Sequence, residues 1–364
     1  MNIVIRADSG VEIGTGHVMR CLTLAKALRE KGHTITFVCK DHDRNIVSHL
    51  ESEGFTVFLL PVDKGKEDAL EHSKWLGGSQ QTDAEQTIAM STQYFEKAPD
   101  LVVVDHYGID RDWHIVFKSY SSATKIFVID DLADRNHECD YLLDQTFMRL
   151  DSDYLSCVPK HCQLMLGTQF ALLRPEFALH NALAREVRDS ECDKSARRVL
   201  VMMGGTDHLN VTANVLNAIR EEASIAKITV VLGPTAPHRK TIEQTIGSDN
   251  RIELLSGVSN VAELMLEHDV CIGGAGAASW ERCAMGLPSI LVAFASNQKT
   301  ILSKLNQFGA VSVFELDAQS NIIREQLNQT FDTNTYSKMV ESCFKVSDGL
   351  GTQRVVGVLT QWIT

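Results

Sequence analysis

A short apolar run, a glycine-rich turn and a helical pattern follow one another at the start of the chain, and this succession is typical of an open α/β sheet. Residues 3–5 predict a buried strand, and apolar residues then recur at helical spacing at Val18, Leu22, Ala25 and Leu28. Gly14 and Gly16 lie between the two elements and allow a close approach of the backbone to a ligand. Such sheets bind ligands at the carboxyl ends of their strands, where a helix N-terminus offers N–H groups to a phosphate. The turn is therefore a candidate ligand-binding loop, with a plain strand-to-helix turn as the alternative.

His17 stands at the start of this helix, beside the glycines. An imidazole at the ligand-binding edge of a sheet can act as a base near neutral pH. The alternative is a helix-start histidine with a purely local role. Asp8, which follows the strand, joins Gly14 and Gly16 among the residues predicted to bind substrate.

The same alternation continues over the first third of the chain. Further strands are predicted at residues 34–39, 55–60, 101–105 and 125–130. Segments 43–54 and 65–95 have helical patterns, the second with a break at Gly77 and Gly78. Strands that alternate with helices imply a parallel sheet covered on both faces.

Two of these strands end in polar clusters on the side where the glycine turn is expected. Asp105, His106 and Tyr107 lie at the end of one strand, and Asp130 and Asp131 at the end of the next. Carboxylates and a phenol at neighbouring strand ends suit the recognition of an amide-bearing sugar, and Asp131 is predicted to bind substrate. Each aspartate can instead be a turn or cap residue. A metal site built from Asp105, His106, Asp130 and Asp131 is a further alternative.

The pattern weakens in the middle of the chain and then resumes. Residues 171–197 are interpreted as an interdomain linker, which carries the predicted substrate-binding residue Arg174 and a helix that begins near Pro175. The first domain is placed at residues 1–170 and the second at residues 198–349. Strands of the second series are predicted at residues 198–203, 227–232, 251–255, 270–272, 288–294 and 311–314.

The strongest local signal in the second series is a glycine-rich turn after a buried strand. Gly274 and Gly276 precede a helix that carries Ser279 and Glu281. Backbone N–H groups in such a turn can hold a diphosphate, Ser279 can cap the helix, and Glu281 can accept hydrogen bonds from ribose hydroxyls. The alternative is a packing turn, with Trp280 in the core and Glu281 in solvent.

Two other segments supply candidate contacts. Gly205 and Thr206 follow the first strand of the second series and suit contact with a phosphate or a ribose. Asn297 and Gln298 follow a later strand, where their amides can bind sugar hydroxyls or N-acyl groups, or can cap the next helix.

Composition limits the class of partner. The chain has 364 residues, enough for two domains, and its net charge of −12 argues against nonspecific binding to nucleic acid or anionic membranes. Neither a secretory signal nor membrane insertion is expected. The nine cysteines are scattered without CxxC spacing, so they are interpreted as thiols in a reducing cytoplasm rather than as zinc ligands.

The segments described above resemble the UDP-2,4-diacetamido-2,4,6-trideoxy-β-L-altropyranose hydrolases of pseudaminic acid biosynthesis, which are similar in fold to the GT-B glycosyltransferases. The resemblance runs from about Met1 to about Gly309. It implies an α/β fold of two Rossmann-like domains that face a central cleft. It also implies that a C-terminal helix, at about residues 350–364, crosses back to the first domain. The residues expected to bind UDP in the second domain are Gly205, Thr206, Gly274, Gly276, Ser279 and Glu281.

By the same match, Tyr107 lines the sugar pocket and Asn297 is a site residue, so His17, Tyr107 and Asn297 form the expected catalytic set. Gln298 and Arg174 are expected to contact the substrate, a small-molecule UDP-sugar. The implied reaction is attack of water on the anomeric carbon, with UDP as the leaving group. No cofactor and no metal are expected, because backbone amides and a helix terminus can stabilise a leaving diphosphate.

Three rival functions remain open at this stage. A GT-B glycosyltransferase would use the same donor with an organic acceptor, and a hydrolase of a related UDP-sugar would share the chemistry. A nonenzymatic nucleotide-sugar sensor is the third, but binding alone does not require a base at His17.

Overall fold

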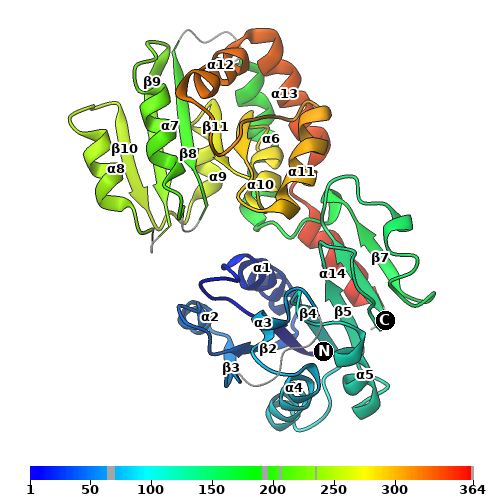
Figure 1. Ribbon diagram of the computed structural model, residues 1–364. Helices are drawn as coiled ribbons and strands as arrows, with labels where there is room; N and C mark the ends of the chain where they lie inside the picture. The colour runs from blue at the N-terminus through cyan, green and yellow to red at the C-terminus, as the bar shows by residue number, and fades with distance from the viewer. Residues whose placement is uncertain (64–69, 191–195, 205–206, 234–235, 362–364) are drawn as a thin grey trace. The chain divides into compact units, whose positions relative to one another are not determined.

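The computed structural model describes residues 1–63, 70–190, 196–204, 207–233 and 236–361 (Figure 1). These residues divide into two compact units. The first comprises Met1–Leu172 together with Gly351–Thr364, and the second comprises Leu173–Leu350. Each unit is a parallel β-sheet with helices packed against it, as Figure 1 shows.

The described part of the first unit contains a seven-stranded parallel sheet. Its strands are β1 (Asn2–Ala7), β2 (Thr34–Lys40), β3 (Thr56–Leu60), β4 (Leu101–Asp105), β5 (Lys125–Ile129), β6 (Tyr141–Asp144) and β7 (Gln163–Leu166), in the spatial order β3-β2-β1-β4-β5-β6-β7. Its helices are α1 (Gly16–Glu30), α2 (Val47–Ser52), α3 (Ser73–Leu76), α4 (Gln80–Phe95), α5 (Arg111–Tyr120) and α14 (Gly351–Thr360), with short 3₁₀ turns at Asp151–Asp153 and Thr168–Phe170.

Both faces of this sheet are buried because successive side chains of a strand point to opposite faces. Ile3 and Ile5 of β1 pack into one apolar cluster with α1, α2 and α14. Val4 packs into a second cluster with α4 and α5 on the other face. This two-sided burial explains why the strands have nearly continuous apolar sequences.

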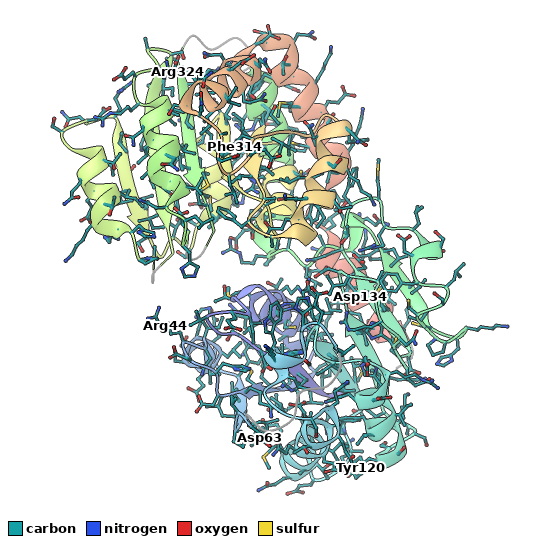
Figure 2. The ribbon with its side chains drawn as sticks, viewed as in Figure 1. Arg44, Asp63, Tyr120, Asp134, Phe314 and Arg324 are labelled. Atoms are coloured by element: carbon teal, nitrogen blue, oxygen red, sulfur yellow. The ribbon has the colours of Figure 1, made fainter. Side chains whose placement is uncertain are left out.

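The second unit repeats the arrangement with a six-stranded parallel sheet in its described residues. The strands are β8 (Arg197–Met202), β9 (Ile225–Leu232), β10 (Ile252–Ser256), β11 (Val270–Gly274), β12 (Ser289–Val292) and β13 (Val311–Val313), in the order β10-β9-β8-β11-β12-β13. The helices are α6 (Pro175–Ser190), α7 (Val211–Ile219), α8 (Arg239–Ile246), α9 (Val261–Leu266), α10 (Ala278–Ala284), α11 (Ser296–Gln307), α12 (Ser320–Phe331) and α13 (Thr333–Val346). Phe314, labelled in Figure 2, lies in the apolar core of this unit.

Each sheet has a point where the strand order changes direction, and ligands of doubly wound sheets bind there. In the first unit this point lies between β1 and β4, where Ala7 is paired with Asp105. In the second it lies between β8 and β11, where Met202 is paired with Gly273. The loops after these four strands therefore meet in two pairs, one pair in each unit.

The chain passes between the units at residues 172–173 and again at 350–351, which differs from the predicted linker at residues 171–197. Most of that segment is helix α6, which belongs to the second unit. Phe177, Ala184 and Arg188 of α6 are buried, and the Arg188 guanidinium donates to the carbonyl oxygens of Met265 and His268 at 2.7 and 2.5 Å. Because α6 is anchored by buried residues in the second unit, most of the predicted linker is part of that unit. Residues 191–195 lie outside the described part of the chain.

Candidate active site

The turn after β1 is held in a fixed shape by its own backbone. Gly10 and Gly14 exchange hydrogen bonds of 3.2 and 2.9 Å, and Gly14 has a φ of +77°, a conformation that a side chain at that position would strain. Thr15, the residue before α1, makes no side-chain capping bond, and Gly16 is exposed. Since no neighbouring atom lies within 4 Å of the place where a Cβ of Gly16 would stand, the start of α1 is open to a ligand.

His17, on the first turn of α1, is oriented by a buried carboxylate. Its Nδ1 lies 2.6 Å from Oδ1 of Asp105, the last residue of β4. Burial alone raises the pKa of Asp105, but Arg20 and His17 outweigh it and hold that pKa below its ordinary value. An ionised carboxylate only accepts hydrogen bonds, so Nδ1 is the donor, and Nε2 of the neutral ring is left to accept a proton.

Arg20, one helical turn after His17, joins Asp105 to a second carboxylate. Its Nε and Nη2 donate to the two oxygens of Asp105, both at 2.6 Å, and its Nη1 donates to Asp131 at 2.6 Å. The Tyr107 hydroxyl donates to the same Asp131 oxygen at 2.7 Å. His17, Arg20, Asp105, Tyr107 and Asp131, here called the His17 network, thus form one continuous set of contacts.

Tyr107 also touches His17 directly. The two rings meet edge to face, with their centroids 4.6 Å apart, and Trp75 stacks on Tyr107 at 5.9 Å. Burial and the neighbouring Asp131 carboxylate raise the pKa of Tyr107 well above its ordinary value, so the phenol keeps its proton at neutral pH. The phenol is therefore a hydrogen-bond donor within the network.

Asp8 does not take the role predicted for it. Its side chain has no exposed surface, and both of its oxygens accept from Arg6, at 2.6 and 2.8 Å. The Lys40 backbone N–H also donates to it at 2.7 Å, and His106 Nε2 lies 3.3 Å away. This correction has a simple cause, because burying the Arg6 guanidinium inside the sheet requires a carboxylate beside it.

The carboxylates considered as metal ligands are paired with arginines instead. Asp130 is fully buried and contacts Arg135 at 2.8 Å, and it accepts from the Tyr154 hydroxyl at 2.8 Å. Arg135 also pairs with Asp134, which is labelled in Figure 2. Among the residues that the structure describes, no group of three or more His, Cys, Asp or Glu side chains is placed to hold a metal ion.

The glycine-rich turn after β11 uses several of its predicted ligand groups internally. A Cβ on Gly274 would come within 2.7 Å of the Phe294 ring, so this glycine is needed for packing. Ser279 is buried within α10, where its hydroxyl lies 3.4 Å from the Gly276 N–H and accepts from Arg282 at 3.1 Å. Ser279 therefore neither caps the helix, which begins at Ala278, nor faces a ligand; these two predictions are corrected.

Gly276 and Glu281 remain available in this turn. Gly276 is exposed, and the space around its Cα is open. Glu281 is partly exposed. Arg174, which is predicted to bind substrate, lies 3.8 Å from its carboxylate and pairs with Glu176 at 3.0 Å. Burial raises the pKa of Glu281 above its ordinary value, against the attraction of Arg174. Trp280 is buried, as the packing alternative predicted.

Three predicted residues cannot be placed in full. Gly205 and Thr206 lie outside the described residues, as does the side chain of Asn297, whose backbone is part of α11. The neighbouring Gln298 accepts a hydrogen bond from the Phe294 N–H at 2.8 Å, so its side-chain oxygen stabilises the turn before α11.

The helix after β8 is capped by the protein itself. Asp207 accepts from the N–H groups of Val211 and Thr212 at 2.8 and 3.0 Å, so its carboxylate occupies the start of α7 where an anion would bind.

Arg20 is a site residue that the sequence analysis missed. Arg20 follows His17 by three residues, and this spacing on a helix places two side chains on one face. That spacing, together with the aspartate at the end of β4, was the available signal.

Within the described residues, no helix is long and apolar enough to span a membrane.

Two parallel α/β units with this repeated strand order define a GT-B-like fold. Acinetobacter baumannii MurG has a similar structure, with a TM-score of 0.67 and 11% identity over 99% of each chain. Residues 198–349 match the glycosyltransferase family 28 C-terminal domain.

The resemblance predicted from the sequence is confirmed. The chain is 25% identical, over 309 residues, to the UDP-2,4-diacetamido-2,4,6-trideoxy-β-L-altropyranose hydrolase of Campylobacter jejuni. The aligned segment covers 85% of this chain and 97% of that protein. It is also 23% identical, over 314 residues, to the spore coat polysaccharide biosynthesis protein SpsG of Bacillus subtilis, covering 85% of this chain and 82% of the relative.

Proposed function

We propose that this protein is an enzyme that hydrolyses UDP-2,4-diacetamido-2,4,6-trideoxy-β-L-altropyranose and releases UDP, as a step of pseudaminic acid biosynthesis. The contact that carries the proposal is the 2.6 Å bond between His17 Nδ1 and Asp105, which leaves Nε2 free to act as a base. The similarity to the Campylobacter jejuni hydrolase over nearly its whole length supports the substrate.

In this mechanism the His17 Nε2 takes a proton from water while the water oxygen forms a bond to the anomeric carbon. The bond from that carbon to the diphosphate oxygen breaks, and its electron pair leaves with UDP. Asp105 stabilises the imidazolium that forms, and it stays ionised because Arg20 holds its pKa low against the effect of burial. The proton on His17 passes to solvent, which restores the neutral base.

Tyr107 and Asp131 complete the sugar side of the proposed site. Tyr107 lies against the His17 ring, and its hydroxyl is directed to Asp131, whose side chain is partly exposed. Asp131 can therefore accept a hydrogen bond from a sugar hydroxyl or an amide N–H. Arg20 and Tyr107 use one oxygen of Asp131, which leaves the other for the substrate.

We place UDP on the second unit, with the exposed turn at Gly276 near the diphosphate and Glu281 near the ribose hydroxyls. The match to the family 28 C-terminal domain over residues 198–349 supports this placement. The open start of α1, at Gly14 and Gly16, is proposed to bind the substrate. Asn297 and Gln298 remain proposed sugar contacts, and the reaction is proposed to need no metal.

The second candidate is a glycosyltransferase that uses a UDP-sugar donor, and the same family 28 match favours it. The two candidates differ in the acceptor, which is water in one and an organic hydroxyl in the other. The base chemistry of His17 serves both.

A UDP-release assay separates these functions. The purified protein is incubated with a panel of UDP-sugars that includes 2,4-diacetamido sugars, without any acceptor, and with and without EDTA. The proposal predicts release from the 2,4-diacetamido substrate that EDTA does not affect. Release only after an acceptor is added supports the transferase, and binding without release supports a sensor. Activity lost in EDTA and restored by one divalent ion contradicts metal independence.

A further inference from the structure

Arg20 occupies the centre of the His17 network and contacts every other charged member of it. It binds both oxygens of Asp105, one oxygen of Asp131, and its Nη2 lies 3.3 Å from His17 Nδ1. It is buried, and the attraction of Asp105 and Asp131 raises its pKa despite the opposing effect of burial. Arg20 is therefore a permanent positive charge held between the base and the two carboxylates.

This position makes Asp105 the shared acceptor of two donors, the His17 imidazole and the Arg20 guanidinium. Oδ1 of Asp105 accepts from both His17 Nδ1 and Arg20 Nη2, at 2.6 Å each. With Arg20 in place, the carboxylate orients His17 while much of its negative charge is already compensated. Without Arg20, the full charge of Asp105 would face His17 alone and favour the imidazolium form.

We propose that Arg20 is a positioning residue that keeps the His17 imidazole neutral and correctly turned, and that links it to Tyr107 through Asp131. The inference rests on the proposed function, because it concerns the same base. It adds a residue whose role is to set the pH range in which that base works, since only a neutral imidazole can take a proton from water.

Other titratable and charged groups lie close to His17. Asp105 at the end of β4, Tyr107 after it and Arg20 on α1 contact His17, while Asp131 lies beyond Arg20. His106, next to Asp105, is buried; burial lowers its pKa although Asp8 opposes this, so it is neutral near pH 7. Arg20 is the cation of this set, so its removal should shift the midpoint of the His17 titration in one direction.

The sign is upward. In Arg20→Met we expect the imidazole of His17 to stay protonated to a higher pH than in the wild type. Arg20→Met removes a like charge from beside the imidazolium and leaves the opposite charge of Asp105 less compensated, so both changes favour the protonated ring. The acid limb of the pH profile for kcat/KM should move upward as well.

The test is an NMR titration of ¹³C,¹⁵N-labelled histidine side chains in the full-length protein, with the His17 signal assigned from His17→Gln. Arg20→Met and Arg20→Gln are compared with the wild type, and folding of each is verified by circular dichroism. Arg29→Met is the matched control, because Arg29 is exposed on the same helix and donates to the Glu53 carbonyl oxygen. The double variant Arg20→Met/Asp131→Asn reduces the uncompensated charge if the single variants fold poorly.

An upward shift of the His17 midpoint in a folded Arg20 variant, absent in Arg29→Met, supports the inference. An unchanged midpoint in a folded Arg20 variant overturns it. The titration does not depend on turnover, so the two proposals fail separately. A wild-type protein that releases no UDP removes the proposed function and leaves the coupling between Arg20 and His17 to be decided by the titration.

Discussion

The two units place different chemistry at equivalent points of the same strand order. Between β1 and β4, the first unit has the mutually paired His17 network, which is buried except for the partly exposed Asp131. Between β8 and β11, the second unit has an exposed glycine turn and one partly exposed acid, Glu281. A preorganised set of charges suits proton transfer, whereas an open turn suits binding of an extended anionic ligand. We infer that the first unit carries the base and the second holds UDP.

The two units also differ at the start of the helix that follows their first strand. In the second unit, the Asp207 carboxylate occupies the start of α7. In the first unit, Thr15 makes no such capping bond at α1. The same topology can therefore present an open helix start in one unit and a self-capped one in the other, and only side chains decide which.

The largest expected effect is loss of the base. His17→Gln should lower kcat by about 10²–10⁴-fold, because a general base contributes that much to proton transfer. UDP affinity should stay unchanged, since UDP is assigned to the other unit. Steady-state kinetics and calorimetry with UDP test this, with His49→Gln on the exposed side of α2 as the control. A fully active His17→Gln would break the assignment of chemistry to the first unit.

A comparable loss of kcat is expected for Asp105→Asn. The amide can orient the His17 ring, but its NH₂ group donates where the carboxylate accepts, which disfavours the required tautomer. Arg20 would also lose a charged partner. Kinetics at several pH values, alongside UDP calorimetry, should show lost turnover with intact UDP binding. Turnover close to that of the wild type would mean that Asp105 only supports packing.

A smaller effect is expected in the second unit. Glu281→Ala should weaken UDP binding by about 1–3 kcal/mol, the range for leaving a hydrogen-bond partner unsatisfied. At saturating substrate, kcat should change much less than in the His17 variant. Isothermal titration calorimetry measures the first quantity, and Glu267→Ala, at the exposed residue directly after α9, is the control. Equal UDP affinity in Glu281→Ala and the wild type would remove Glu281 from the nucleotide site.

The smallest expected effect is on stability in acid. The lowered pKa of Asp105 means that its charge stabilises the folded state above the unfolded carboxyl pKa of about 4. That stabilisation is lost as the pH falls toward the folded pKa. Urea unfolding of wild type and Asp105→Asn should therefore differ most near neutral pH and converge as the pH drops below about 4. A difference that is independent of pH would show that the pairing with Arg20 and His17 is not electrostatic.

Much of the framework could be predicted from the sequence because strands buried on both faces are apolar throughout. The predicted strand at residues 101–105 coincides with β4, and that at residues 34–39 is one residue shorter than β2. Strands β6 and β7 were missed, since Tyr141–Asp144 and Gln163–Leu166 are short and fall where the pattern weakens.

The site was only partly predictable, for a physical reason. Strand ends and glycines indicate where a ligand binds, so His17 and Asp131 could be proposed from position, and the family resemblance added Tyr107. Which carboxylates face the site depends on ion pairs between distant segments. The sequence predicts that Asp8 binds substrate, but Asp8 is bound to Arg6. It assigns no single role to Asp105, which orients His17. Such pairing leaves no periodic signal in the sequence.

Hydrolysis in ¹⁸O-labelled water tests the central claim, that water activated by His17 attacks the anomeric carbon. After a single turnover of the UDP-sugar, mass spectrometry locates the label in the products. The account predicts ¹⁸O in the released sugar and unlabelled UDP, with label transfer slowed in His17→Gln to the same degree as UDP release. Label in the phosphate of UDP would mean attack at phosphorus and would contradict the account.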